Sequence, residues 1–160
     1  MAEKSRRAAV AAITVDDGSR RVPIHNIHGE EIGVFHFHPT DIGIIQRYND
    51  LVGRFDEITE PLLREDGGEE EGREQRRAEA LREAEKRLCD AVNALFGGDA
   101  AGAFFGNMHP FSPVGGAFYC ETVLQALGQY ISEQFDAETA RFSRRTDKYT
   151  RMAEAPGGEK

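Results

Sequence analysis

The sequence predicts an α+β fold, in which an N-terminal β-hairpin packs on a three-helix, mainly α-helical domain with an acidic helical arm. Three observations support this prediction. Apolar residues alternate with polar ones between residues 21 and 38, as is typical of half-buried strands. Apolar residues recur at steps of three and four in three later segments, as is typical of amphipathic helices. The charged segment 65–74 contains no apolar side chain and therefore predicts a solvent-exposed connection.

Length and charge limit the classes of function. The chain has 160 residues and a formal net charge of −8, which suits one soluble domain with a modest core and argues against a nucleic-acid partner. No apolar run reaches the roughly 18 residues of a membrane span, so we expect no membrane partner. Cys89 and Cys120 lie in predicted helices, where we expect reduced core thiols rather than a disulfide.

The expected domain organisation has three parts. Residues 1–12 are polar and alanine-rich and are expected to be a flexible N-terminus. A single α+β domain is expected over residues 13–135, beginning with a candidate short strand at residues 13–15 and a turn at Asp16-Asp17-Gly18-Ser19. Residues 136–160 are expected to form a basic helical extension that ends in a disordered tail.

A β-hairpin is predicted next, because the segments 21–28 and 31–38 flank Gly29-Glu30. A two-residue turn with glycine at its first central position would join the strands. One face of this hairpin is more apolar than the other, and we expect that face to pack on the helices. The predicted pairs on it are Val22 with Phe37 and Ile24 with Phe35, while the other face carries His25, Ile27, Ile32, Val34 and His36.

The first helix is predicted to begin at Pro39, because proline is favoured in a first helical turn, with Asp41 close to its N-terminal amides. Pro61 is expected to end or kink this helix near Thr59. The acidic loop at residues 65–74 is expected at the tip of a two-helix arm. The apolar stripe of the first helix consists of Ile44 or Ile45, Tyr48, Leu51 or Val52, Phe55, Ile58 and Leu62.

A second helix is predicted over residues 73–96, antiparallel to the first and ended by Gly97-Gly98. A short helical turn at residues 99–105 and an irregular loop at residues 106–116 follow. The third long helix is predicted over residues 117–135. The stripes of these two helices are Leu81, Ala84, Leu88, Val92 and Leu95, and then Cys120, Val123, Leu124, Leu127, Ile131 and Phe135.

The motif His36-x-His38-Pro39 is the most specific candidate for chemistry. Two histidines at this spacing on a strand point the same way and can share a metal ion. The motif resembles that of JAMM-type zinc isopeptidases, which implies a Ser-x-x-Asp ligand pair on the next helix and a separate catalytic glutamate. Here Arg47 stands where that serine would be, and Asp50 is the best match to the aspartate. The preferred interpretation is therefore two hairpin histidines, with His38 at the helix cap.

Two segments are candidates for binding a protein. The end of the chain between residues 141 and 151 carries five basic residues and one acidic residue, with aromatic residues between them, and could dock in an acidic or apolar groove. It could equally be a solvated extension, or fold back on the acidic loop. The aromatic loop near residues 104–111 could be an adaptable apolar surface, although filling the core is slightly favoured. The candidate residues are Phe104, Phe105, Met108, Phe111, Arg141, Phe142, Arg144, Arg145 and Tyr149.

Five short motifs occur together in this chain: Phe37-His38-Pro39-Thr40-Asp41, Arg47-Tyr48, Cys89-Asp90-Ala91-Val92-Asn93-Ala94-Leu95-Phe96-Gly97, Phe105-Gly106 and Gly115-Gly116. This combination resembles a group of small phage and prophage proteins from the tail-gene region, described as tail assembly chaperone-like, although His38 stands where asparagine or aspartate is usual. The resemblance covers roughly residues 20–135. It implies a protein without catalytic residues or cofactors that binds the tape-measure protein, an elongated helical chain, in the bacterial host cytoplasm. The expected alternatives are a structural or connector component of the tail and, less favoured, a zinc-dependent hydrolase using His36 and His38; homo-oligomerisation is left open.

Overall fold

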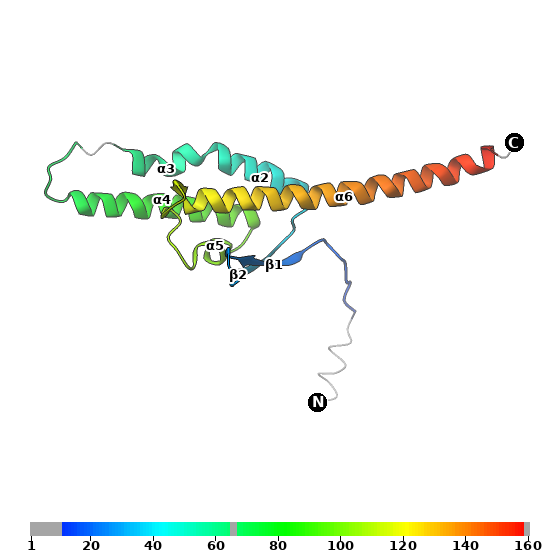
Figure 1. Ribbon diagram of the computed structural model, residues 1–160, viewed down its shortest axis with the longest axis horizontal. Coiled ribbons are helices and arrows are strands. Elements are labelled where there is room, and N and C mark those ends of the chain that lie inside the picture. Colours follow the sequence, from blue (N-terminus) through cyan, green and yellow to red (C-terminus); the bar gives the residue numbers. More distant parts are fainter. Residues whose placement is uncertain (1–10, 65–66, 159–160) are drawn as a thin grey trace, which may run out of the picture.

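The computed structural model of the chain describes residues 11–64 and 67–158, with side chains described as far as residue 145. A two-stranded hairpin lies against one side of a group of helices, and the last helix runs on alone beyond the others (Figure 1). The predicted α+β class is confirmed. The elements are β1 (Arg20–His25), β2 (Glu31–Phe37), α2 (Ile42–Gly53), α3 (Phe55–Leu63), α4 (Arg73–Phe96), α5 (Ala101–Phe105), β3 (Pro113–Val114), β4 (Ala117–Phe118) and α6 (Tyr119–Gly158).

The hairpin forms in a register different from the predicted one. Val22 lies opposite Phe35, and Ile24 lies opposite Gly33, with a register shift between Ile24 and His25. The predicted pairs, Val22 with Phe37 and Ile24 with Phe35, are therefore wrong by two residues. Because side chains alternate along a strand, a shift of two residues leaves each one on its predicted face.

The cause of the register error is the side chain of Asn26. Its Oδ1 accepts hydrogen bonds from the backbone N–H of His28 at 2.9 Å and of Glu30 at 3.1 Å. The backbone N–H of Asn26 also donates to the carbonyl of Glu30 at 3.0 Å. An asparagine that bonds the backbone in this way builds a longer turn than the expected two-residue turn, and the strands pair accordingly.

The first predicted helix is divided into two and begins later than expected. Asp41 is the N-cap of α2, and its Oδ1 accepts a hydrogen bond from the backbone N–H of Gly43 at 3.0 Å. The expected position of Asp41 at the helix terminus is confirmed, whereas the predicted start at Pro39 and the predicted cap by His38 are wrong. Aspartate is among the preferred N-cap residues, because its side-chain oxygen accepts a hydrogen bond from a free amide of the first helical turn.

Pro61 lies inside α3, which continues to Leu63, so the predicted helix end near Thr59 is wrong. The missing N–H of Pro61 cannot bond the carbonyl of Glu57 four residues before it. Arg87 on α4 supplies the missing donor, since its Nη1 lies 2.7 Å from that carbonyl oxygen. The break between α2 and α3 occurs at Arg54 instead.

The second long helix, α4, has the predicted bounds, residues 73–96. Gly97 ends it with a φ of 72°, and the backbone N–H of Gly97 donates to the carbonyl of Asn93 at 2.8 Å, the arrangement for which glycine is suited. Leu88 and Ala84 on this helix are fully buried. The predicted turn at residues 99–105 contains α5, and the loop after it includes the unpredicted two-residue strands β3 and β4.

Helix α6 packs on α2 at one close contact. The Tyr48 hydroxyl donates a hydrogen bond to the carbonyl of Leu124 at 2.8 Å. A Cβ at Gly128 would lie only 2.4 Å from that hydroxyl oxygen, so the glycine permits the approach. The helix continues to residue 158, past the predicted end at 135. The predicted disordered tail is therefore wrong for residues 155–158, while residues 159–160 lie outside the described part.

The start of the chain also differs from the prediction. Residues 13–15 form no strand in the structure, so the candidate strand there is wrong. Residues 1–10, most of the expected flexible N-terminus, lie outside the described residues. Ile13 and Val15 are 93% and 71% exposed, because no neighbouring element of the described chain covers them.

Candidate functional site: an apolar groove between the hairpin and α6

Aromatic rings fix the hairpin to the helices. The rings of Phe35 and Phe37 on β2 are stacked with centroids 4.6 Å apart. Phe96 at the end of α4 meets both rings edge-on at 5.0 Å, and Phe104 on α5 lies 4.8 Å from Phe35. Edge-on and offset stacked contacts are the preferred arrangements of aromatic side chains, so β2 is held firmly at this position.

A glycine brings β2 still closer to α5. A Cβ at Gly33 would lie 2.2 Å from the carbonyl oxygen of Ala103, much closer than any real contact. The hairpin therefore rests directly on the backbone of α5 at this point. β1 pairs with β2 and with no other described strand.

An apolar groove of about 650 Å³ lies between the hairpin and α6. Side chains of β1 and the following turn form one wall, and one face of α6 forms the other. Met108 and Val114, from the loop before α6, also line it. The wall residues are mainly Val22, Pro23, Ile24 and Ile27 on the hairpin, and Val123, Ala126, Leu127 and Tyr130 on α6.

The chemistry of the groove suits apolar side chains. None of the described residues that line it carries a carboxylate, a guanidinium, an ammonium or a thiol. Its polar side chains are His25, Asn26, His28 and Thr122, together with two tyrosines. The Tyr119 hydroxyl donates to the carbonyl of Phe104 at 3.3 Å, and burial raises its pKa. The groove thus offers contact area and few directed polar groups.

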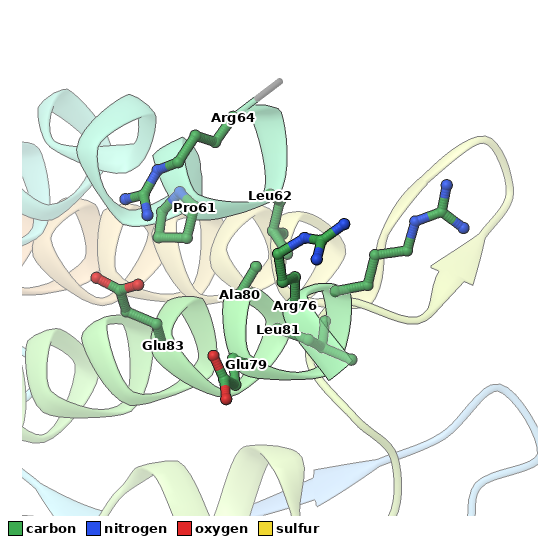
Figure 2. Close-up of a pocket in the computed structure, with 9 residues that line it drawn as sticks. Pro61, Leu62, Arg64, Arg76, Glu79, Ala80, Leu81 and Glu83 are labelled. Carbon is green, nitrogen blue, oxygen red and sulfur yellow. The ribbon is translucent and has the colours of Figure 1, made fainter. Parts of the chain in front are cut away.

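A second pocket, of about 760 Å³, lies at the tip of the arm between α3 and α4 (Figure 2). Pro61, Leu62, Ala80 and Leu81 give it an apolar lining, and charged side chains surround them (Figure 2). Most of these charged side chains already form ion pairs or hydrogen bonds within the chain. Arg64 pairs with Glu60 at 2.6 Å, and Arg76 donates to the carbonyls of Glu69 and Glu71.

The arm-tip pocket is therefore a less suitable site than the groove. A ligand there would compete with ion pairs and hydrogen bonds that the arm already makes. Of the predicted acidic loop, the described residues 67–72 lie at this tip and lead into α4 (Figure 1). Its charges keep the tip hydrated and lower its tendency to associate with other acidic surfaces.

His36 and His38, the less favoured candidates for metal binding, are exposed. His36 lies opposite Arg21, and the His38 Nε2 lies 2.7 Å from the Asp17 Oδ2. Within the described part of the chain, histidine, cysteine and acidic side chains form no group of three or more that could hold a metal ion. The structure thus gives His38 a partner in the N-terminal segment that the sequence did not indicate.

The contact with His38 should be visible in the titration of Asp17. Hydrogen bonding to His38 and Ser19 holds the pKa of the Asp17 carboxyl well below its usual range. A lowered pKa in the folded state means that the contact favours folding above the usual carboxyl pKa and that this contribution is lost as the pH falls. We expect carbon NMR to show Asp17 still ionised where an ordinary aspartate is half protonated. His38→Ala should raise that pKa, whereas His36→Ala should not. Equal titration in all three proteins would contradict the contact.

The two cysteines are free thiols. Cys120 is fully buried, and burial raises its pKa to about 12. Cys89 is partly buried, and burial together with nearby Glu85 raises its pKa. A thiol with a raised pKa is a poor nucleophile at neutral pH, so these side chains act as parts of the core.

The predicted protein-binding residues fall into two separate places. Phe104 and Phe111 are buried in the core, while Phe105 and Met108 are partly buried. Phe104 and Met108 reach the groove. The basic residues lie on α6 beyond the other helices, far from the hairpin (Figure 1). On this extension Arg141, Phe142, Arg144 and Arg145 are exposed, and Arg141 pairs with Glu138 at 3.0 Å; the side chain of Tyr149 lies outside those described.

Sequence reasoning missed the groove walls. Val22 and Ile24 were expected to be covered by the helices, yet they stay partly exposed. The width of the apolar face of α6 could have indicated these walls. Its buried stripe consists of Leu124, Leu127 and Ile131. Val123, Ala126 and Tyr130 lie beside that stripe and are only partly buried or exposed. An apolar face wider than its buried part indicates a surface with room for a further partner.

Comparison with protein-family models, curated proteins and solved structures finds no match for the chain. Among the described residues, no helix is both long enough and apolar enough to cross a membrane.

Proposed function

We propose that the protein is a non-enzymatic binding protein that holds an apolar helical segment of a partner in the groove between the hairpin and α6. The observation that carries this proposal is the mainly apolar lining of that groove, which contains no Asp, Glu, Lys or Arg among the described residues, in a chain with a net charge of −8. Large apolar hollows on a charged surface commonly mark sites of protein binding.

The shape of the groove favours a helix as the bound segment. Its α6 wall runs from Tyr119 to Tyr130, which is about 17 Å at 1.5 Å per residue and matches three turns of a partner helix. A strand is less favoured, because Pro23 has no N–H to offer at the β1 edge. Helix-in-groove binding needs only apolar anchors at steps of three and four residues on the partner.

The tape-measure protein is the proposed partner, because the chain resembles tail assembly chaperone-like proteins of phages and prophages. The apolar face of a long, partly apolar helical chain must be shielded from water until the tail tube encloses it. The groove can bury that face, and the acidic arm formed by α3 and α4 supports solubility. Binding of this kind is stoichiometric and takes place in the bacterial cytoplasm under this proposal.

Peptide binding tests the proposal. Labelled peptides of about 20 residues, tiled across the tape-measure protein of the same genome, are titrated and followed by fluorescence anisotropy. We expect at least one to bind, and Ala126→Arg to weaken its binding about tenfold or more, equivalent to about 1.4 kcal/mol, because a cation enters the apolar groove.

The matched control is Gln125→Arg, which places the same side chain on an exposed neighbouring position of α6 outside the groove lining. It should leave affinity within about twofold, as expected for a surface substitution. The proposal fails if no peptide binds the wild-type protein, or if both arginine variants bind equally well.

A structural or connector role in the tail is the second candidate. The exposed part of α6 beyond the bundle favours it (Figure 1), since such a helix could join neighbouring subunits. Mass spectrometry of purified particles separates the two roles. A chaperone is absent from mature tails, whereas a connector is present at a fixed copy number.

A further inference from the structure

The segment that leads into β1 exposes two large apolar side chains. Residues 11–19, which we call the N-terminal arm, contain neither helix nor strand and lead away from the helices (Figure 1). Ile13 is 93% exposed and Val15 is 71% exposed. Removing such side chains from water is favourable, so burial of Ile13 and Val15 on another surface would stabilise this segment.

The end of the N-terminal arm that joins β1 is fixed by specific contacts. Asp16 Oδ1 accepts a hydrogen bond from the Gly18 N–H at 3.0 Å, and Asp17 Oδ1 accepts one from the Ser19 N–H at 3.0 Å. The other carboxylate oxygen of Asp17 contacts His38 at 2.7 Å. These contacts hold the start of the hairpin, and none of residues 11–19 lines the groove of the same chain.

The part of the N-terminal arm before Asp16 is uncharged, as is the described lining of the groove. Residues 8–15 contain no charged residue, and the described groove lining contains no Asp, Glu, Lys or Arg. Ile13 and Val15 are two residues apart, so in extended backbone both point to the same side, about 7 Å apart. The roughly 17 Å length of the α6 wall accommodates both side chains. Insertion of these side chains requires no backbone hydrogen bonds to β1, so the missing N–H of Pro23 does not oppose it.

We propose that two copies of this chain exchange N-terminal arms, with Ile13 and Val15 of each copy inserted into the groove of the other. The exchange is reciprocal and closes into a symmetric dimer. It rests on the same groove as the proposed function, so a partner helix would displace the arm. The groove would then stay covered until its partner arrives.

Complementary variants test the exchange. The arm variant carries Ile13→Asp and Val15→Asp, and the groove variant carries Ala126→Arg; all three side chains are exposed in one chain, so folding should persist, as circular dichroism checks. Sedimentation velocity should give about twice the chain mass for the wild-type protein and the single-chain mass for each variant. An equimolar mixture should recover a mixed dimer, because it retains one intact arm and one intact groove.

Thr14→Asp is the control, since Thr14 points to the opposite side of an extended arm and should leave the dimer intact. A wild-type protein that stays monomeric, or variants that remain dimeric, would overturn the exchange. A mixture without dimers would do so too. The proposed function is judged separately, because the arm variant keeps its groove and should bind the tape-measure peptide at least as tightly as the wild-type protein.

Discussion

Replacing Phe35 by alanine should lower the free energy of unfolding by about 3–5 kcal/mol. Phe35 is 8% exposed, and its ring lies within 5.0 Å of the ring centroids of Phe37, Phe96 and Phe104. The substitution removes apolar burial and leaves a cavity that the surrounding rings cannot close. Because domains are stable by only about 5–15 kcal/mol, the loss is a large part of the total.

Urea denaturation followed by circular dichroism measures this effect. Ile27→Ala is the matched control on the same hairpin, since Ile27 is 95% exposed and its truncation should change stability by less than about 0.5 kcal/mol. A loss below about 1 kcal/mol for Phe35→Ala would mean that the aromatic cluster does not hold the hairpin. The hairpin wall of the groove would then not be fixed by those rings.

Features decided by local sequence could be predicted. The bounds of α4 follow from a regular stripe that ends at Gly97, and the role of Asp41 follows from its place before α2. Both depend on backbone amides and carbonyls within a few residues. The face of the hairpin that packs inward was also predicted correctly, because it needs only the alternation of side chains.

Features decided by contacts between distant residues could not be predicted. Pro61 is tolerated in α3 because Arg87, 26 residues later in the chain, bonds the carbonyl of Glu57. The groove likewise depends on how the hairpin and α6 are placed, and the residues of both walls have the same apolar character as core residues. A sequence pattern shows that such residues favour burial, but it does not show how much of their surface the fold buries.

Gly33→Ala is expected to lower the free energy of unfolding by about 1–3 kcal/mol, the usual cost of inserting a group into a packed core. The new Cβ would lie 2.2 Å from the carbonyl oxygen of Ala103 and 3.1 Å from its carbon. Both are backbone atoms, so the clash is relieved only if β2 moves away from α5. Thermal denaturation should show a midpoint lower by about 2–4 °C for each kcal/mol lost.

Gly53→Ala is the control for this substitution, because a Cβ at Gly53, the last residue of α2, would meet nothing within 4 Å. It should be neutral or stabilising by up to about 1 kcal/mol, since alanine favours helix more than glycine does. The two variants remove the same flexibility from the unfolded chain, so their difference isolates the contact with α5. If Gly33→Ala is as stable as Gly53→Ala, β2 does not rest on the backbone of α5, and the hairpin wall of the groove must lie farther out than the geometry places it.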